Sequence, residues 1–121
     1  MRPIPIRFRD CERRRLLGFE ISVATTWPSR LLGLALLARD RAGTGLLIPH
    51  CRSVHTVGMR FRLDLLFLDR DGRVVEICRD VPAGRFLRCR RAAAVLELPA
   101  PQPLRQIERD LHASADNVLH I

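Results

Sequence analysis

A chain of 121 residues with 47% hydrophobic and 28% charged side chains has the composition of one folded domain, which excludes an intrinsically disordered protein. All 21 basic side chains are arginine, and they outnumber the 13 acidic ones to give a formal net charge of +8. We therefore expect a single domain over residues 1–121 with a basic surface.

The first third of the chain predicts two strands and a helix. Alternating apolar and polar residues at 4–10 (IPIRFRD) indicate an edge strand, and Leu16–Ala24 indicate a second strand after a turn at DCERRR. Thr25 or Thr26 followed by Pro28 is typical of a helix start. Leucines then recur at helical spacing, so this helix is expected to end near the sequence ARDRAGTG.

The middle of the chain predicts a short strand and a hairpin. Residues 46–49 form the short strand. The apolar runs Leu63–Leu68 and Val74–Cys78 are separated by DRDG, in which the aspartate and glycine are typical of a tight turn.

The last third predicts one more strand and a helix. Residues 80–91 read as a loop with a short strand, and the apolar run AAAVLELPA as a strand that ends at Pro99. Apolar residues on one face indicate a helix over residues 103–115, and DNVLHI, residues 116–121, reads as a closing strand. These elements predict a mainly β (α+β) domain. It would be a small antiparallel barrel-like or sandwich fold of about seven short strands, with one central helix and one short C-terminal helix.

A ligand pocket is expected around the segment His55–Asp64, because polar groups gather there beside an apolar run, as binding pockets require. The segment offers an imidazole, a hydroxyl, a thioether, a guanidinium and a carboxylate. The candidate ligand-binding residues are His55, Thr56, Met59, Arg60 and Asp64. A small polar or anionic ligand, or an extended peptide, would suit this set.

A structural role for part of this segment stays open. Asp64 begins a strongly apolar strand and needs a partner there, which Arg60 or Arg62 would supply. In an extended chain, residues 60, 62 and 64 would share one face. The pair would then attach the loop to the rest of the domain and would not bind a ligand.

An enzyme is the second hypothesis, although no catalytic residue or metal ligand is assigned and the cofactor is unknown. Cys51, His55 and Asp64 have the residue types of a thiol nucleophile, its base and an orienting carboxylate. His50, Cys51 and His55 would need a further cysteine to complete a zinc site. The simplest reading of the four widely spaced cysteines is free thiols.

The remaining partner classes receive less support. The arginines are spread along the chain without interleaved aromatic residues, which favours a solvated basic surface over the third hypothesis, nucleic-acid binding. The sequence has no apolar run of membrane-spanning length and no apolar segment before Arg7 that would indicate a signal peptide. We therefore expect a cytoplasmic protein of undetermined oligomeric state.

Three stretches resemble an uncharacterised bacterial and archaeal family, domain of unknown function 192 (DUF192). They are VATTWPSRLLGLALLARD, GTGLLIPHCRSVHTVGMRFRLDLLFLDRDGRVVEI and AAAVLELPA, and together they cover about Ile21 to Ala100. The resemblance implies a small, mainly β, barrel-like domain, and it implies no activity. Arg62 and Pro101 stand where relatives usually carry a small residue and a glycine.

Overall fold

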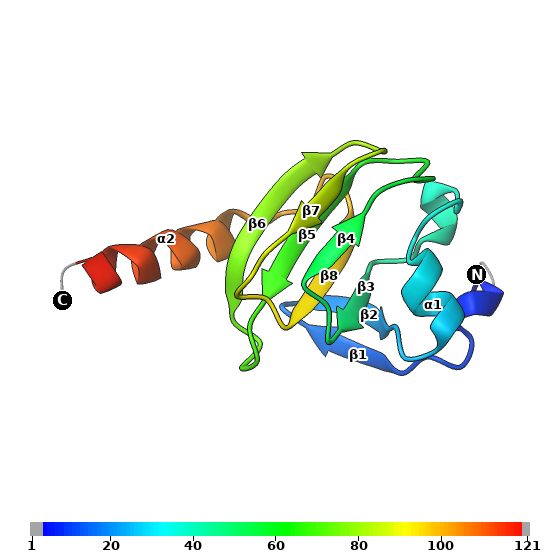
Figure 1. Ribbon diagram of the computed structural model, residues 1–121, viewed down its shortest axis with the longest axis horizontal. Coiled ribbons are helices and arrows are strands. Elements are labelled where there is room, and N and C mark those ends of the chain that lie inside the picture. The colour runs from blue at the N-terminus through cyan, green and yellow to red at the C-terminus, as the bar shows by residue number, and fades with distance from the viewer. Residues whose placement is uncertain (1–3, 120–121) are drawn as a thin grey trace.

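The computed structural model describes residues 4–119, with side-chain surroundings up to residue 113. Within that range the chain forms eight strands, two α-helices and two short 3-10 helices (Figure 1). In chain order, the elements are η1 (Ile6–Phe8), β1 (Arg13–Leu16), β2 (Phe19–Val23), α1 (Trp27–Leu32), η2 (Arg39–Arg41), β3 (Leu46–Pro49), β4 (Ser53–His55), β5 (Leu63–Leu68), β6 (Val74–Val81), β7 (Phe86–Arg88), β8 (Ala94–Pro99) and α2 (Arg105–Leu119).

Six strands form one sheet in the order β1-β2-β3-β8-β5-β6, and β4 and β7 form a separate two-stranded sheet. The mainly β (α+β) class is thus confirmed. The larger sheet is mixed, because β2 pairs parallel to β3 after a connection that contains α1 and η2. A parallel pair needs such a crossover, whereas an antiparallel hairpin does not. Over the described residues the two sheets do not close into a barrel.

The predicted N-terminal strand is wrong, and the turn predicted after it over residues 10–15 ends before β1. Residues 6–8 form a 3-10 helix that follows Pro5, and the arginines of the expected turn form β1. The hairpin turns at Leu17 and Gly18, whose φ angles are +53° and +85°. Two successive positive φ angles give a turn whose twist matches that of paired strands, so the hairpin turns at residues 17–18 and not within residues 10–15 as predicted.

The first helix is shorter than predicted. Its start agrees, because the Thr26 side chain accepts a hydrogen bond from the Ser29 amide in a capping box. It ends at Gly33, which has a φ of +52°. That conformation lies outside the helical region, so residues 34–38 leave the helix and Leu34 enters the core.

The hairpin of β5 and β6, the short strand β7 and the strand β8 are confirmed. The closing strand predicted at residues 116–121 is wrong over 116–119, which continue α2, and residues 120–121 lie outside the described part. Figure 1 shows α2 pointing away from the sheets. None of the helices within residues 4–119 is long and apolar enough to cross a membrane.

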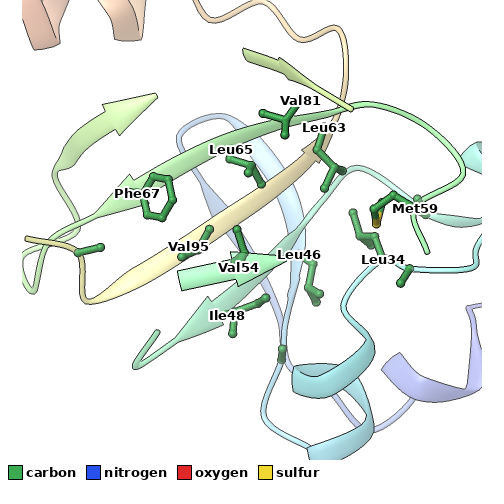
Figure 2. Packing of buried hydrophobic residues seen from close by; sticks show 14 of the residues in the cluster. Leu34, Leu46, Ile48, Val54, Met59, Leu63, Leu65, Phe67, Val81 and Val95 are labelled. Carbon is green, nitrogen blue, oxygen red and sulfur yellow. The ribbon is translucent and has the colours of Figure 1, made fainter. Parts of the chain in front are cut away.

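The larger sheet buries apolar side chains on both faces. Alternate residues of β5 face opposite ways, so Leu65 and Phe67 lie in one cluster and Leu66 and Leu68 in the other. The first cluster, shown in Figure 2, includes Val54 of β4, which places the two-stranded sheet on that face. The second cluster includes Leu104 from the segment before α2.

Candidate functional site: a buried carboxyl group under the first helix

One carboxyl group lies in the middle of the larger sheet. Glu97 of β8 is only 4% exposed, and its cross-strand neighbours are Leu46 of β3 and Leu65 of β5. Both neighbours belong to the first apolar cluster, so the carboxyl group faces the main core. Among the described residues, Glu97 has no hydrogen-bond or ion-pair partner. Burial raises the pKa of Glu97 to about 8.

A small pocket of about 70 Å³ opens above this carboxyl group, and we call it the Glu97 pocket. Gly33, at the end of α1, forms part of its wall. A Cβ atom at Gly33 would lie 2.7 Å from Oε1 of Glu97, so glycine leaves the space that the carboxyl group occupies. The other lining residues come from α1, β3, β4 and the following loops; they are Arg30, Leu31, Leu32, Ile48, Cys51, Ser53, Val54, His55 and Met59.

Two of the predicted ligand-binding residues, His55 and Met59, line the Glu97 pocket. His55 is exposed at the end of β4. Met59 is 8% exposed and belongs to the first apolar cluster, where Figure 2 shows it at the same end as Leu34. The structure therefore gathers an imidazole, a thioether and a carboxyl group around one small opening.

Thr56 lies next to His55, but its hydroxyl group forms hydrogen bonds with backbone groups. Its side chain is fully buried, and its hydroxyl group donates to the Pro82 carbonyl at 2.8 Å and accepts from the Arg85 amide at 2.8 Å. The Thr56 amide in turn donates to the Arg85 carbonyl at 2.8 Å. These bonds join the end of β4 to the loop between β6 and β7.

Replacing Thr56 by valine should lower the free energy of unfolding by about 2 kcal/mol, because the Arg85 amide loses its acceptor and the Pro82 carbonyl its donor while the side-chain volume is kept. Urea unfolding followed by circular dichroism would measure the change. Thr44→Val is the matched control, because Thr44 is exposed. An equal effect of the two substitutions would contradict a structural role for the Thr56 hydroxyl.

The Asp64 carboxylate also forms hydrogen bonds with backbone groups. It is 1% exposed, and its two oxygens accept from the amides of Asp80 at 2.8 Å and Gln102 at 2.9 Å. The cation nearest to it is Arg79, whose Nε lies 4.0 Å from Oδ1. Arg62, expected as a partner, lies instead 3.6 Å from a carboxylate oxygen of Asp80.

Arg60 is exposed and lies in the turn region before β5, which starts only at Leu63. The extended face expected for residues 60, 62 and 64 therefore does not form. Neither Arg60 nor Asp64 is among the residues that line the pocket with His55. The ligand-binding role of the five candidate residues stays a prediction, and the structure brings only His55 and Met59 together.

The structure does not gather the predicted trio of Cys51, His55 and Asp64 at one opening. All four cysteines are free thiols, as predicted. Cys51 donates to the Ser53 carbonyl at 2.9 Å and lines the Glu97 pocket with His55, but Asp64 does not join them. Burial raises the pKa of both the Cys78 and the Cys89 thiols, which makes them poor nucleophiles. The described part of the chain holds no group of three or more His, Cys, Asp or Glu residues able to bind a metal ion.

A family model matches residues 10–106, which is most of the chain. That model is DUF192, described as "Uncharacterized ACR". The chain belongs to the DUF192 family. No curated protein matches it.

Two solved structures resemble the fold of this DUF192 chain. One is a protein of unknown function from Novosphingobium aromaticivorans DSM 12444, with a TM-score of 0.58 and 20% identity over 74% of this chain and 69% of that one. The other, from Sinorhizobium meliloti 1021, is provisionally named a transcription regulator; its TM-score is 0.59, with 22% identity over 79% of this chain and 83% of that one. At these identities the likeness shows the fold alone.

Glu97 is the site residue of this DUF192 chain that the sequence analysis missed. The signal was present, because an acidic residue interrupts the apolar run VLELPA. The rule that a buried charge needs a partner was applied to Asp64, and it holds equally for Glu97. Only the structure shows that Asp64 has its partners and Glu97 has none among the described residues.

Exposed apolar side chains surround the mouth of the Glu97 pocket. Leu31 and Leu32 line it and are 61% and 37% exposed, and Phe86, which pairs with His55 across the small sheet, is 70% exposed. In this DUF192 domain, a buried carboxyl group thus lies below a rim that is partly apolar and that also includes Arg30, whose Nη1 donates to the Pro49 carbonyl at 2.6 Å.

Proposed function

We propose that this DUF192 domain is a binding module whose Glu97 pocket takes a protonated nitrogen at the end of an apolar stem. The observation that carries the proposal is the Glu97 carboxyl group, which is 4% exposed and has no partner among the described residues. A buried carboxylate without a partner is unstable relative to one in water. A bound ammonium or guanidinium group would supply both the charge and the hydrogen bonds that the protein does not.

The size of the pocket limits what it can enclose. A volume of about 70 Å³ corresponds to roughly two water molecules in the liquid, at about 30 Å³ each, so only a head group fits inside. The rest of the ligand would lie on the apolar side chains at the mouth, Leu31, Leu32 and Phe86. An alkylamine, or a peptide with a basic side chain, has this combination of a charged head and an apolar stem.

The proposal keeps part of the predicted binding segment. His55 and Met59 would contact the ligand from the pocket wall. Thr56 and Asp64 would hold the loops on either side of them through the backbone hydrogen bonds described above. The sequence predicted a small polar or anionic ligand or an extended peptide, whereas we expect a cationic group in this pocket, because its floor is a carboxyl group.

n-Hexylamine is a suitable probe, followed by amide chemical shifts in heteronuclear NMR. It should shift the amide signals of Gly33, His55 and Met59 in a saturable way at pH 7.5, whereas hexan-1-ol should not. In the variant Glu97→Gln the affinity for hexylamine should fall by about tenfold or more, because one charge-assisted interaction is lost. Glu20→Gln, at an exposed position of β2, is the matched control and should bind normally.

Affinity should also rise with pH, because binding of a cation favours the ionised form of Glu97. Equal binding of hexylamine by wild type and Glu97→Gln would contradict the proposal, and so would shifts that hexan-1-ol reproduces. Arg60→Ala tests the original assignment of that residue. If Arg60→Ala lost hexylamine binding but kept the wild-type melting temperature, Arg60 would be a ligand-binding residue, as predicted from the sequence.

A further inference from the structure

A broad hollow lies away from Glu97, at the ends of several strands. Its volume is about 1190 Å³, and three loops form it: residues 49–52 after β3, 69–71 in the turn between β5 and β6, and 90–94 before β8. We call it the loop hollow. In Figure 1 these loops lie at the lower end of the larger sheet as drawn.

Four guanidinium groups line the loop hollow, from Arg52, Arg70, Arg90 and Arg91. All four side chains are exposed. Arg91 donates to the Val75 carbonyl at 3.3 Å. Within residues 4–119, the other three have no hydrogen-bond or ion-pair partner, so their donors face solvent.

Two carboxylates also line the loop hollow, and they do not cancel its charge. Asp69 is engaged in its own turn, where Oδ1 accepts from the amides of Asp71 and Arg73 at 2.9 Å each. Asp71 is exposed. No ion pair joins either aspartate to the arginines of the hollow in the described residues. Four fixed positive charges therefore face two negative ones.

We propose that the loop hollow binds a ligand that carries several phosphate groups, through the guanidinium groups of Arg52, Arg70 and Arg90. The planar guanidinium fork matches phosphate oxygens, and three of them around one opening suit more than one phosphate. The hollow is larger than a single anion requires. No phenylalanine, tyrosine or tryptophan lines it, and His50 is the one aromatic ring among its lining residues, so recognition would rest mainly on the phosphates.

The sequence did not reveal this arrangement, because its arginines come from three separate loops. The two densest arginine groups are residues 13–15 and 88–91, and the structure places the first group on β1. Arg52 and Arg70 join the second group only after β3, β5 and β8 are paired in the sheet. The proposal is independent of the Glu97 pocket, since of all the lining residues only Cys51 belongs to both openings.

The test uses the full chain and two probes, inorganic tripolyphosphate and a single-stranded DNA oligonucleotide. Titration calorimetry would follow the first and fluorescence anisotropy the second, both at low and at high salt. We expect the triple variant R52Q/R70Q/R90Q to weaken binding by about a hundredfold, because several charge-assisted contacts are lost together. Binding should also weaken as salt is added.

A matched control separates this site from the general charge of the protein. The variant R15Q/R39Q/R109Q also removes three exposed arginines, but from β1, η2 and α2. It should bind both probes nearly as the wild type does, and both triple variants should keep the wild-type melting temperature. R90Q alone, measured in parallel, should give a smaller loss of the same kind even if the triple variant folds poorly.

Each result decides for or against the proposal. Binding of tripolyphosphate alone identifies a small phosphate ligand, and binding of the oligonucleotide, with the same loss in R52Q/R70Q/R90Q, identifies nucleic-acid phosphates as the source. If neither tripolyphosphate nor the oligonucleotide binds at low salt, the proposal is overturned. Equal losses in the two triple variants would also overturn it, because they would show attraction by net charge without a site.

Discussion

Glu97→Gln should raise the melting temperature by roughly 10 °C at pH 8 and leave it nearly unchanged below pH 4.5. The substitution keeps the shape of the side chain but removes its ability to ionise. At pH 8, ionisation of Glu97 is favourable in the unfolded chain and opposed by burial in the folded one. The expected gain is on the order of 3 kcal/mol, which for a domain of this size corresponds to that shift.

The pH range of the effect follows from the pKa of Glu97, which is raised from 4.5 to about 8. Below pH 4.5 the carboxyl group is protonated in both states and contributes nothing to the pH dependence. Between pH 4.5 and pH 8 the folded protein holds a proton that the unfolded chain has released, so wild-type stability falls as the pH rises. Above pH 8 the full loss is reached, and the difference between variant and wild type stays constant.

Thermal unfolding of both proteins across this pH range would measure the effect as a difference, in which the other titrating groups cancel. Glu20→Gln, on the exposed face of β2, should show no such growing difference. A constant offset between wild type and Glu97→Gln at all pH values would mean that the Glu97 carboxyl group is not desolvated. Saturating hexylamine should reduce the difference at pH 8, if the proposed function holds.

Asp64→Ala should have the largest destabilising effect among substitutions in the predicted segment, about 3 kcal/mol. The Asp64 oxygens accept from the amides of Asp80 and Gln102, and alanine would leave both donors unpaired. Asp80 has a φ of +54° and lies at an irregularity in the pairing of β5 with β6, so its backbone depends on this contact. The lost acceptor should therefore loosen both the end of β6 and the segment that leads to α2.

Urea unfolding would give the free energy, and hydrogen exchange of the Asp80 and Gln102 amides would localise the change. Asp71→Ala, in the exposed turn between β5 and β6, should change stability by less than about 0.5 kcal/mol. If Asp64→Ala lowered the free energy of unfolding no more than Asp71→Ala does, the structural role of Asp64 would be contradicted. The ligand-binding role predicted from the sequence would then be supported.

The central hairpin was predictable because its signals are local. A long apolar run, the turn sequence DRDG and a second β-rich run leave few other structures for residues 63–78. The N-terminal region was not predictable from its sequence pattern. Residues 4–10 alternate between apolar and polar as a strand would, but residues 6–8 form a 3-10 helix. Leu17 and Gly18 adopt positive φ angles that no apolar periodicity indicates, and Gly33 ends α1 inside a run of leucines.

The candidate site was only partly predictable, because it depends on which strands become neighbours. His55 and Met59 are close in sequence and were identified together. Glu97 joins them only because β8 lies between β3 and β5, and no sequence pattern in the chain indicates that strand order. Sequence spacing shows that Asp64 and Glu97 both need partners, but it does not show which of them finds one.

The strand β1 has a consequence for self-association. It forms one edge of the six-stranded sheet, and three of its four residues, Arg13, Arg14 and Arg15, are exposed arginines. An unprotected edge strand is a template for pairing with another copy of the chain, and rows of like charge oppose such pairing. Nη2 of Arg14 lies 3.3 Å from a carboxylate oxygen of Glu12, and Glu20 of β2 lies opposite Arg15, so the acidic residues beside this edge offset only part of its charge. Two copies that met along β1 would bring several guanidinium groups against each other, so this edge should resist aggregation.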